Sequence, residues 1–291
     1  MKRGLGITLN YTPYAFTIAT LVILNFLVYW VIFIEESRPD LSVYYLEVGQ
    51  ADATLIEAQN GNRILIDVGG GRATADAVIN LLPFYDRNID VVIITHPHSD
   101  HMDGLVPLLE QVSVGVVLDS GSGHRTGVVE EYLIALEGYG VKKVYARRGM
   151  VINLSEVAKA FILFPDRNTA LLDPDNASIW VQVKHRDNAF LFTGDSFVAV
   201  ERYMVDLDGE RLESDVFQAG HHGSRTSNSA ELLKMIAPDY VIISAGENNR
   251  YGHPHDEVME VFLSTGAEVL KTFEEGNMVF ISDQGGIERV K

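Results

Sequence analysis

The longest uninterrupted apolar run in the chain lies near its N-terminus. Residues 14–34 read YAFTIATLVILNFLVYWVIFI and contain no charged side chain. A helix of about 20 apolar residues crosses the ~30 Å hydrocarbon core of a bilayer. Tyr29 and Trp30 lie near the far end of the run, where aromatic side chains often mark the membrane surface. The pattern therefore predicts a transmembrane helix over residues 14–34.

The charges on either side of this run favour one orientation. Lys2 and Arg3 precede it, whereas Glu35 and Glu36 follow it. The positive-inside tendency then makes residues 1–13 a short cytoplasmic N-terminus and puts everything after the run outside the cytoplasm. We therefore expect a single-pass protein of the cell membrane with an extracytoplasmic body.

Two other interpretations of the run remain open. A cleaved signal peptide has a shorter apolar core and a small-residue cleavage site, and Ile34-Glu35-Glu36-Ser37 is a poor one. A buried core helix that is apolar on all sides is uncommon in a domain of this size.

The body, residues 35–291, alternates short apolar runs with turn signals. Residues 42–48 and 52–58 are rich in β-branched and aromatic side chains and are predicted to be strands, and Asn60-Gly61 is a strong hairpin turn signal. Hairpins followed by alternating strands and helices predict one continuous α/β domain with two sheets and helices outside. Further strands are predicted at residues 63–67, 91–95, 114–118, 160–164, 179–184, 189–193, 216–219, 240–244, 269–272 and 278–282, and helices at 73–82, 104–112, 128–136, 197–205, 230–236 and 257–265.

Composition narrows the chemistry of the body. Of 23 basic residues only Lys2 and Arg3 precede residue 35, so the body holds 21 basic and 40 acidic residues, a net charge of −19. Such acidity argues against broad binding of phosphate backbones, which requires Lys and Arg. The basic pairs Lys142-Lys143 and Arg147-Arg148 are expected to form a solvated face. With no cysteine in the chain, a transition-metal site must use His and carboxylates.

The strongest chemical signal is His96-Pro97-His98-Ser99-Asp100-His101, directly after the predicted strand 91–95. Three of the chain's 9 histidines lie within these six residues, and four more occur at 221–222 and 253–255. A loop that leaves a strand can turn alternate side chains to one side. His96 and His98 can then bind one ion, while Asp100 and His101 bind a second ion nearby.

These motifs carry a family resemblance over residues 40–285. The His-x-His-x-Asp-His loop, Asp67 at a preceding strand end and Thr193-Gly194-Asp195 resemble the metallo-β-lactamase superfamily. Within it, the segments at 46–50, 221–224 and 249–254 resemble the hydrolase domain of ComEC-type DNA-uptake proteins. The resemblance implies a four-layer αββα sandwich, preceded here by the transmembrane helix, with two divalent metal ions, Zn²⁺ or Mn²⁺, at one edge of its sheets.

The resemblance also implies roles for individual residues. Asp195 would bridge the two metals, and one of His221 and His222, preferably His222, would complete the second site. Asp67 would support the histidine loop from outside the ligand set. The implied metal ligands are His96, His98, Asp100, His101, Asp195, His221 and His222.

The chain departs from the family pattern at two positions. Many members have a further histidine where this sequence reads Asp175-Asn176-Ala177-Ser178. The first metal site then has fewer ligands and is expected to bind more weakly or to exchange its ion. Ala51 also replaces the glycine that is usual in the turn after residue 50.

The expected reaction is hydrolysis of a phosphodiester by a hydroxide that two metals activate. Asp100 and Asp195 would hold the metals, and Asp195 would also orient the hydroxide. Arg250, Tyr251 and His253 would stabilise the leaving oxygen or supply its proton. The expected substrate-binding residues are Ser224, Arg225, Arg250 and Tyr251.

Several functions remain open on these grounds. We expect a nuclease related to DNA uptake, acting alone or beside a separate channel protein, since one predicted span is no channel. An esterase or phosphodiesterase on choline phosphate or teichoic-type envelope substrates is the alternative that an extracytoplasmic body favours. The third candidate is a non-catalytic scaffold on the same fold. The complete His96–His101 cluster with Asp195 speaks against it, because enzymes that have lost their activity tend to lose their ligands.

Overall fold

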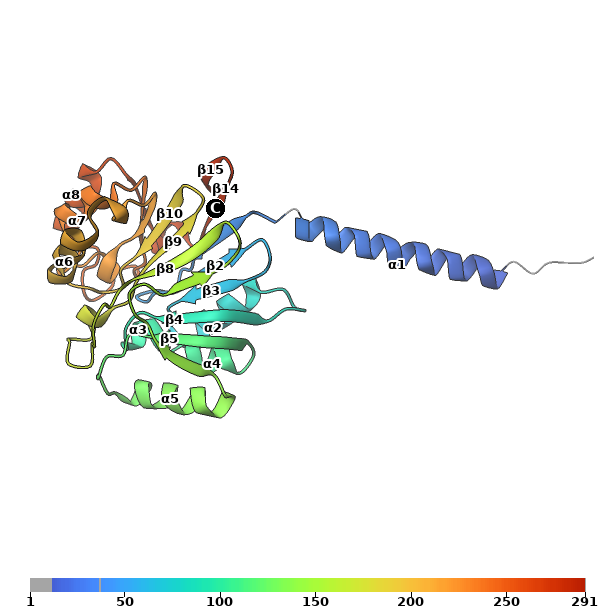
Figure 1. Ribbon diagram of the computed structural model, residues 1–291, viewed down its shortest axis with the longest axis horizontal. Coiled ribbons are helices and arrows are strands. Elements are labelled where there is room, and N and C mark those ends of the chain that lie inside the picture. The colour runs from blue at the N-terminus through green and yellow to red at the C-terminus, as the bar shows by residue number, and fades with distance from the viewer. Residues whose placement is uncertain (1–11, 37, 291) are drawn as a thin grey trace, which may run out of the picture. The chain divides into compact units, whose positions relative to one another are not determined.

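The computed structural model of the protein describes residues 12–36 and 38–290 (Figure 1). The predicted cytoplasmic segment, residues 1–13, lies outside the described residues except for its last two positions. The chain divides into two compact units, one that ends at Arg38 and one that begins at Pro39.

Helix α1 (Thr12–Glu36) contains the apolar run near the N-terminus. Its stretch Tyr14–Phe33 is long and apolar enough to cross a membrane, and no part of that stretch is buried against protein. Since this apolar surface is not covered, length and composition fit a membrane span. A signal sequence meets the same criteria.

Within residues 38–290, the first sheet has eight strands in the order β15-β14-β1-β2-β3-β4-β5-β6. Neighbours from β15 to β3 pair antiparallel, whereas β3, β4, β5 and β6 run parallel. The strands are β1 (Leu41–Tyr45), β2 (Thr54–Ala58), β3 (Arg63–Ile66), β4 (Asn88–Ile94), β5 (Ser113–Asp119), β6 (Lys142–Tyr145), β14 (Met278–Asp283) and β15 (Gly286–Arg289).

The second sheet, in the same described range, has seven strands in the order β13-β12-β11-β10-β9-β8-β7. Strands β10 to β13 run parallel, and β7 to β10 pair antiparallel. The strands are β7 (Val151–Asn153), β8 (Ala158–Phe164), β9 (Trp180–His185), β10 (Asn188–Phe192), β11 (Val216–Gln218), β12 (Tyr240–Ile243) and β13 (Glu268–Lys271).

Alternation along the strands separates the apolar cores. In β4, Val91 and Ile93 face the core between the two sheets, where they meet Val183 and Phe190 of the second sheet. Val92, between them, faces the helices on the other side of the first sheet. A strand buried on both faces needs a continuous apolar run, which explains the sequence of β4.

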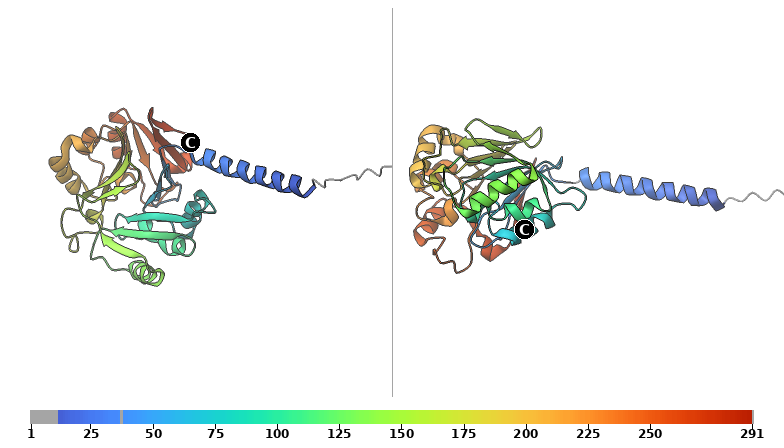
Figure 2. Two further views of the ribbon diagram at one scale, coloured as in Figure 1. Left: turned by 45° about the vertical axis from the view of Figure 1, so that its right-hand side comes forward. Right: turned by 90° about the horizontal axis from the view of Figure 1, so that it is seen from below.

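Helices cover the outer face of each sheet (Figures 1 and 2). Buried side chains of α2, α4 and α5 pack against the first sheet, and those of α6, α7 and α8 pack against the second. The expected four-layer αββα sandwich is therefore confirmed. The helices are α2 (Gly71–Leu81), α3 (Ser99–Met102), α4 (Leu105–Leu109), α5 (Gly127–Tyr139), α6 (Val198–Asp208), α7 (Ala230–Ile236), α8 (Asp256–Ser264) and α9 (Thr272–Glu275).

The structure differs from the sequence pattern mainly at the sheet edges. Strands β6, β7 and β15, which the pattern does not predict, are all edge strands. Edge strands are short and partly exposed, so they lack the apolar alternation that marks buried strands. The helix predicted over 104–112 is the short helix α4, and α3 precedes it inside the histidine loop.

The carboxyl ends of parallel strands position the chemistry-bearing loops. Asp67 follows β3, and the His96–His101 loop follows β4. In the second sheet, Asp195 follows β10, and His221 and His222 follow β11. Because parallel strands end at the same edge of their sheet, each sheet presents its loops together at one edge.

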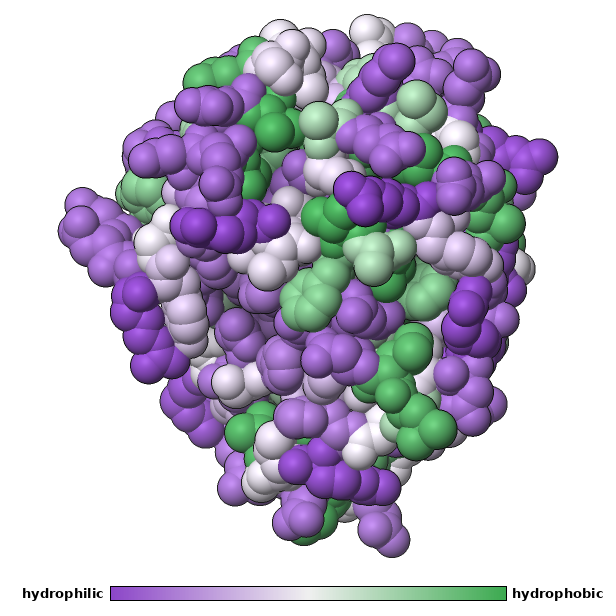
Figure 3. All heavy atoms as spheres, turned by 90° about the vertical axis from the view of Figure 1, so that its left-hand side faces the viewer, coloured by the Kyte–Doolittle hydropathy of each residue, from purple (hydrophilic) through white to green (hydrophobic). Residues whose placement is uncertain are grey.

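The face that carries α6, α7 and α8 is predominantly hydrophilic (Figure 3). Hydrophobic side chains visible there form small separate groups rather than one continuous patch. Within this view, the surface has no broad apolar area of the kind that marks a protein interface.

Gly69 fixes the position of the histidine loop, and its replacement tests that contact. A Cβ atom at Gly69 would lie 1.6 Å from the carbonyl oxygen of Asp100. We expect Gly69→Ala to displace the loop and to lower the free energy of unfolding by about 3 kcal/mol or more, the upper range for over-packing. Thermal unfolding of the full chain in detergent measures the effect.

The matched control is Gly138→Ala in α5, where a Cβ atom would meet nothing within 4 Å. Alanine favours helices, so this variant should unfold at the same or a higher temperature. Equal unfolding temperatures for the two variants would show that Gly69 does not hold the loop.

Candidate metal centre

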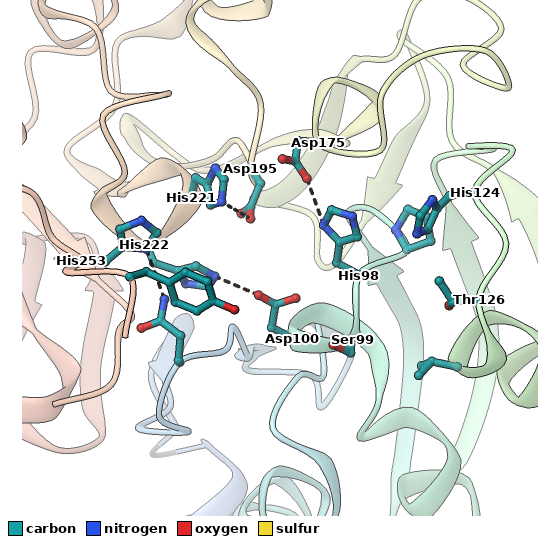
Figure 4. Close-up of a pocket in the computed structure, with 14 residues that line it drawn as sticks. His98, Ser99, Asp100, His124, Thr126, Asp175, Asp195, His221, His222 and His253 are labelled. Atoms are coloured by element: carbon teal, nitrogen blue, oxygen red, sulfur yellow. Dashed lines mark hydrogen bonds and ion pairs between the residues drawn. The ribbon is translucent and has the colours of Figure 1, made fainter. Parts of the chain in front are cut away.

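Three segments that are distant in the sequence meet where the two sheets end (Figure 4). They are the His96–His101 loop, Asp195, and the pair His221 and His222. Side chains from all three line a cavity of about 350 Å³. The structure therefore brings together the segments that the sequence predicted to converge.

The first group of side chains is His96, His98 and Asp175. The Nε2 atom of His96 lies 3.0 Å from Nδ1 of His98 and 3.5 Å from Oδ1 of Asp175. Nδ1 of His98 lies 3.0 Å from the same oxygen. These three atoms lie close enough to bind one ion together. Asp175 is the first residue of the segment 175–178 in which the resemblance implied a histidine, and its carboxylate lies beside both imidazoles.

The second group comprises Asp100, His101, Asp195 and His222. Nε2 of His101 lies 3.4 Å from Oδ1 of Asp195, and Nε2 of His222 lies 3.5 Å from Oδ2 of Asp100. The other oxygen of Asp195, Oδ2, lies 3.8 Å from Nε2 of His96 in the first group. Asp195 therefore stands between the two groups, with one oxygen toward each.

Both imidazoles of the second group are held from behind through Nδ1. Nδ1 of His101 lies 2.8 Å from Asp67, and Nδ1 of His222 lies 2.9 Å from the carbonyl oxygen of Ser244. Asp52 approaches the same two nitrogens, at 3.8 Å from His101 and 3.5 Å from His222. Asp52 is close enough to join this group. Its carboxylate, however, approaches Nδ1 of both rings and not Nε2, so it supports the imidazoles from outside the group.

Asp67 also fixes the start of the loop. Its carboxylate accepts hydrogen bonds from the backbone N–H and the hydroxyl of Thr95, at 2.8 and 2.7 Å. Asp67 is buried and so cannot exchange these partners for water. The contact puts Asp67 beside Nδ1 of His101, away from the Nε2 atom that faces Asp195.

The donor atoms fit a pair of metal ions. Within residues 12–36 and 38–290, five side chains of the site have a buried polar atom without a hydrogen-bond partner. Tetrahedral ligands at ordinary zinc distances lie about 3.3 Å apart, close to the spacings above. A cation would satisfy atoms that the protein leaves unpaired. The five side chains are Asp52, His101, Asp175, Asp195 and His222. Asp52 lies outside the two groups, so the cations would satisfy the other four.

The carboxylates and imidazoles of the site shift one another's pKa values. Burial alone would raise the pKa of Asp195, but the charges of His101 and His96 hold this pKa well below its usual range. Burial likewise opposes the charge on His101, but Asp195 and Asp67 raise the pKa of that imidazole well above its usual value. The buried carboxylates therefore demand positive charge beside them.

Backbone strain also concentrates here. Asp67, His221 and His222 have φ values of 57°, 49° and 55°. Non-glycine residues in this left-handed region cost about 1–3 kcal/mol each and cluster at functional sites. At residues 221 and 222 this backbone turns both rings inward: Nε2 of His221 lies 3.5 Å from Asp195, and His222 reaches Asp100 (Figure 4).

The predicted substrate-contacting residues separate into two sets. Tyr251 and His253 line the cavity, and Arg250 lines an adjoining hollow. Ser224 and Arg225 are not among the side chains that line the cavity. Ser224 is buried against Thr226, and Arg225 forms an ion pair of 3.1 Å with Glu257 that turns it away.

The sequence pattern missed four side chains of the site. Asp52 and Asp175 are single carboxylates among 40 acidic residues, so nothing in their spacing marks them. His124 packs edge-on against His98 with ring centroids 5.4 Å apart. Gln50 lies within the motif at 46–50 and contacts Nδ1 of His253 at 3.3 Å.

Comparison with protein families and curated proteins gives consistent matches. The sequence model of the metallo-beta-lactamase superfamily matches residues 46–247. The chain is 27% identical to the ComE operon protein 3 of Bacillus subtilis, over 81% of this chain and 32% of that protein. It is 31% identical to recombination protein 2 of Haemophilus influenzae, over 79% of this chain and 27% of that protein. The chain thus spans about a third of the length of these relatives.

Solved structures share the fold at low sequence identity. The metallo-beta-lactamase fold protein YhfI of Bacillus subtilis has a TM-score of 0.53 and 13% identity, with 80% of this chain and 96% of that chain covered. The diiron β-hydroxylase CmlA of Streptomyces venezuelae has a TM-score of 0.54 and 16% identity, with 84% and 55% covered. Similarity at this level concerns the fold alone.

The outer carboxylate Asp67 gives a test of how the site is held. We expect Asp67→Asn to reduce metal affinity by about 10- to 100-fold, because His101 and Thr95 lose a charged acceptor. Asparagine tolerates the positive φ at this position, so the fold should be retained. Competition titration with a chromophoric chelator measures the affinity, and circular dichroism checks the fold. Unchanged affinity would remove Asp67 from the support of the site.

Proposed function

Because this chain belongs to the metallo-β-lactamase superfamily, we propose that it is a hydrolase whose clustered imidazoles and carboxylates hold two divalent cations. The observation that carries the proposal is the group of unpaired buried donor atoms at the centre. When bound, two such cations activate a water nucleophile and neutralise charge that develops at a phosphoryl group.

The proposed ligand sets follow the two groups of side chains. His96, His98 and Asp175 hold the first cation, with Asp175 in place of the missing histidine. Asp100, His101 and His222 hold the second, Asp195 is shared, and His221 stands beside it. Two imidazoles and carboxylates on each side suit both Zn²⁺ and Mn²⁺.

His253 is proposed to donate a hydrogen bond rather than a proton. Burial and the neighbouring His222 and His221 lower the pKa of His253 to about 4, so its ring is neutral near pH 7. Gln50 uses its carbonyl oxygen to accept from the N–H of Gly246, which leaves its NH₂ group to donate to Nδ1 of His253. Nε2 of His253 then carries the hydrogen and can donate it to a substrate oxygen.

The proposed substrate is a phosphodiester, and the proposed activity is that of a nuclease related to DNA uptake. The names of recombination protein 2 and of the competence protein ComA of Neisseria gonorrhoeae, which is 27% identical over 99% of this chain, support this choice. Helix α1 supports a single-pass anchor. We propose that the hydrolase body lies outside the cytoplasm and acts beside a separate channel protein. If the body is extracytoplasmic, a phosphodiester of the cell envelope is the second candidate substrate.

Removing Asp100 tests the proposed activity directly. We expect Asp100→Ala to lower the rate of hydrolysis of bis-p-nitrophenyl phosphate by at least about 100-fold, because the second cation loses a ligand. The assay uses the full chain in detergent with added Zn²⁺ or Mn²⁺. Single-stranded and duplex DNA serve as further substrates.

Asp103→Asn is the matched control for that experiment. Asp103 lies in the same loop and accepts a hydrogen bond from the backbone of Gly71, outside both ligand groups. This variant should keep most of the activity. Full activity in Asp100→Ala would contradict the two-cation site, and no turnover of any phosphodiester by the wild type would leave the scaffold interpretation.

The assignment of Asp175 predicts the metal preference of the first site. Carboxylates suit Mn²⁺, whereas imidazoles suit Zn²⁺. We expect Asp175→His to bind more zinc relative to manganese than the wild type after dialysis against equal concentrations of both. Elemental analysis by mass spectrometry measures the ratio. An unchanged ratio and stoichiometry would show that Asp175 is not a ligand.

A further inference from the structure

A second hollow adjoins the metal centre on the side of the first sheet. His124 lines both this hollow and the metal cavity, and Arg125, Lys143 and Tyr145 line its outer part. Strand β6, which ends at Tyr145, runs parallel to β5, and β5 runs parallel to β4. Strand β6 therefore ends, at Tyr145, at the same sheet edge as β4, which His96 follows.

Tyr145 is an exposed aromatic ring between two cations. The ammonium of Lys143 lies 5.0 Å from the ring centroid, and the guanidinium of Arg147 lies 5.8 Å from it. Tyr145 lies on a sheet edge beside the site and is 52% exposed. An exposed aromatic ring flanked by cations is a surface on which a nucleobase can stack while its phosphates are neutralised.

The positive charge in this hollow is only partly neutralised. Lys143 lies 3.7 Å from Asp119. Within the described residues, Arg125 and Arg147 form no ion pair with a carboxylate, whereas Arg148 next along the chain pairs with Asp208 at 2.5 Å. In a chain of net charge −17, unpaired arginines beside the site mark a local place for anions.

A similar arrangement lies on the other side of the metal centre. Tyr251 lines both the metal cavity and a third hollow, which Arg250 also lines. The guanidinium of Arg250 lies 4.7 Å from the ring centroid of Tyr251, whose side chain is 49% exposed. Tyr145 and Tyr251, each with a cation beside its ring, thus line two hollows that adjoin the metal cavity.

We propose that the metal cavity and these two adjoining hollows form one groove that binds a single-stranded polynucleotide across the metal centre, with a subsite formed by Tyr145, Lys143, Arg147 and Arg125. A base stacks on Tyr145, and Arg147 and Arg125 contact the phosphates beside it. This inference rests on the proposed phosphodiesterase function and assigns its substrate to a polymer rather than a small diester.

The chemistry of the subsite favours a single strand over a duplex. Bases in a duplex already stack on one another, so their faces are not free for Tyr145. The basic groups are few and confined to the groove, and the rest of the acidic body repels a second phosphate backbone.

The test compares a polymer with a small substrate in the full chain. We expect Tyr145→Ala to lower kcat/KM for a dT12 oligonucleotide by about 10-fold or more relative to kcat/KM for bis-p-nitrophenyl phosphate, with the loss in KM. Tyr145→Phe should restore the ratio, because it keeps the ring. Tyr139→Ala is the matched control, since Tyr139 is 53% exposed on α5 and does not line the groove.

Binding of labelled dT12 in EDTA gives a readout that does not need turnover. Arg147→Ala should reduce the slope of log affinity against log salt by about 0.7, the value for one phosphate contact on a single strand. Equal kcat/KM ratios in wild type and Tyr145→Ala, or tighter binding of a duplex than of dT12, would overturn the proposal. Failure to hydrolyse bis-p-nitrophenyl phosphate would instead count against the phosphodiesterase function, and dT12 binding would still test the groove.

Discussion

The burial of charge at one edge of the sandwich is the constraint on which the rest of the structure depends. Asp195, His96 and His101 are almost completely inaccessible to solvent. Buried ions are costly unless they are paired and hydrogen-bonded. Of eleven buried side-chain atoms without a hydrogen-bond partner in the described part of the chain, five belong to this site. The proposed pair of cations would supply charge and bonds that the protein itself does not provide.

The fold serves this constraint by bringing strand ends from two sheets together. The histidine loop leaves the first sheet, Asp195 and the paired histidines leave the second, and Asp67 and Asp52 hold the imidazoles from behind. Strained backbone at residues 67, 221 and 222 directs these side chains. Such strain persists only where surrounding packing stabilises it, and the three buried cores provide that packing.

The sequence could predict what depends on local pattern. Buried strands such as β4 have continuous apolar runs, and the four proposed ligands of the His96–His101 loop lie within six residues. Asp175 could not be predicted because its role depends on a distance to His98 across two sheets. The edge strand β6 could not be predicted for a related reason. Its residues Lys142–Tyr145 do not alternate between apolar and polar side chains, and only the pairing with β5 puts Tyr145 beside the metal centre. Arg225, which the sequence predicted to bind substrate, forms an ion pair with Glu257. Sequence spacing does not reveal this contact.

The central claim is that the two groups of side chains hold two cations, and anomalous diffraction tests it most directly. Crystals grown with Zn²⁺ or Mn²⁺ would be measured on both sides of the absorption edge of the metal. The account predicts two anomalous peaks about 3.5–4 Å apart, one among His96, His98 and Asp175 and one among Asp100, His101 and His222, with Asp195 between them. No peak at this position under saturating metal, or peaks only elsewhere on the surface, would contradict it.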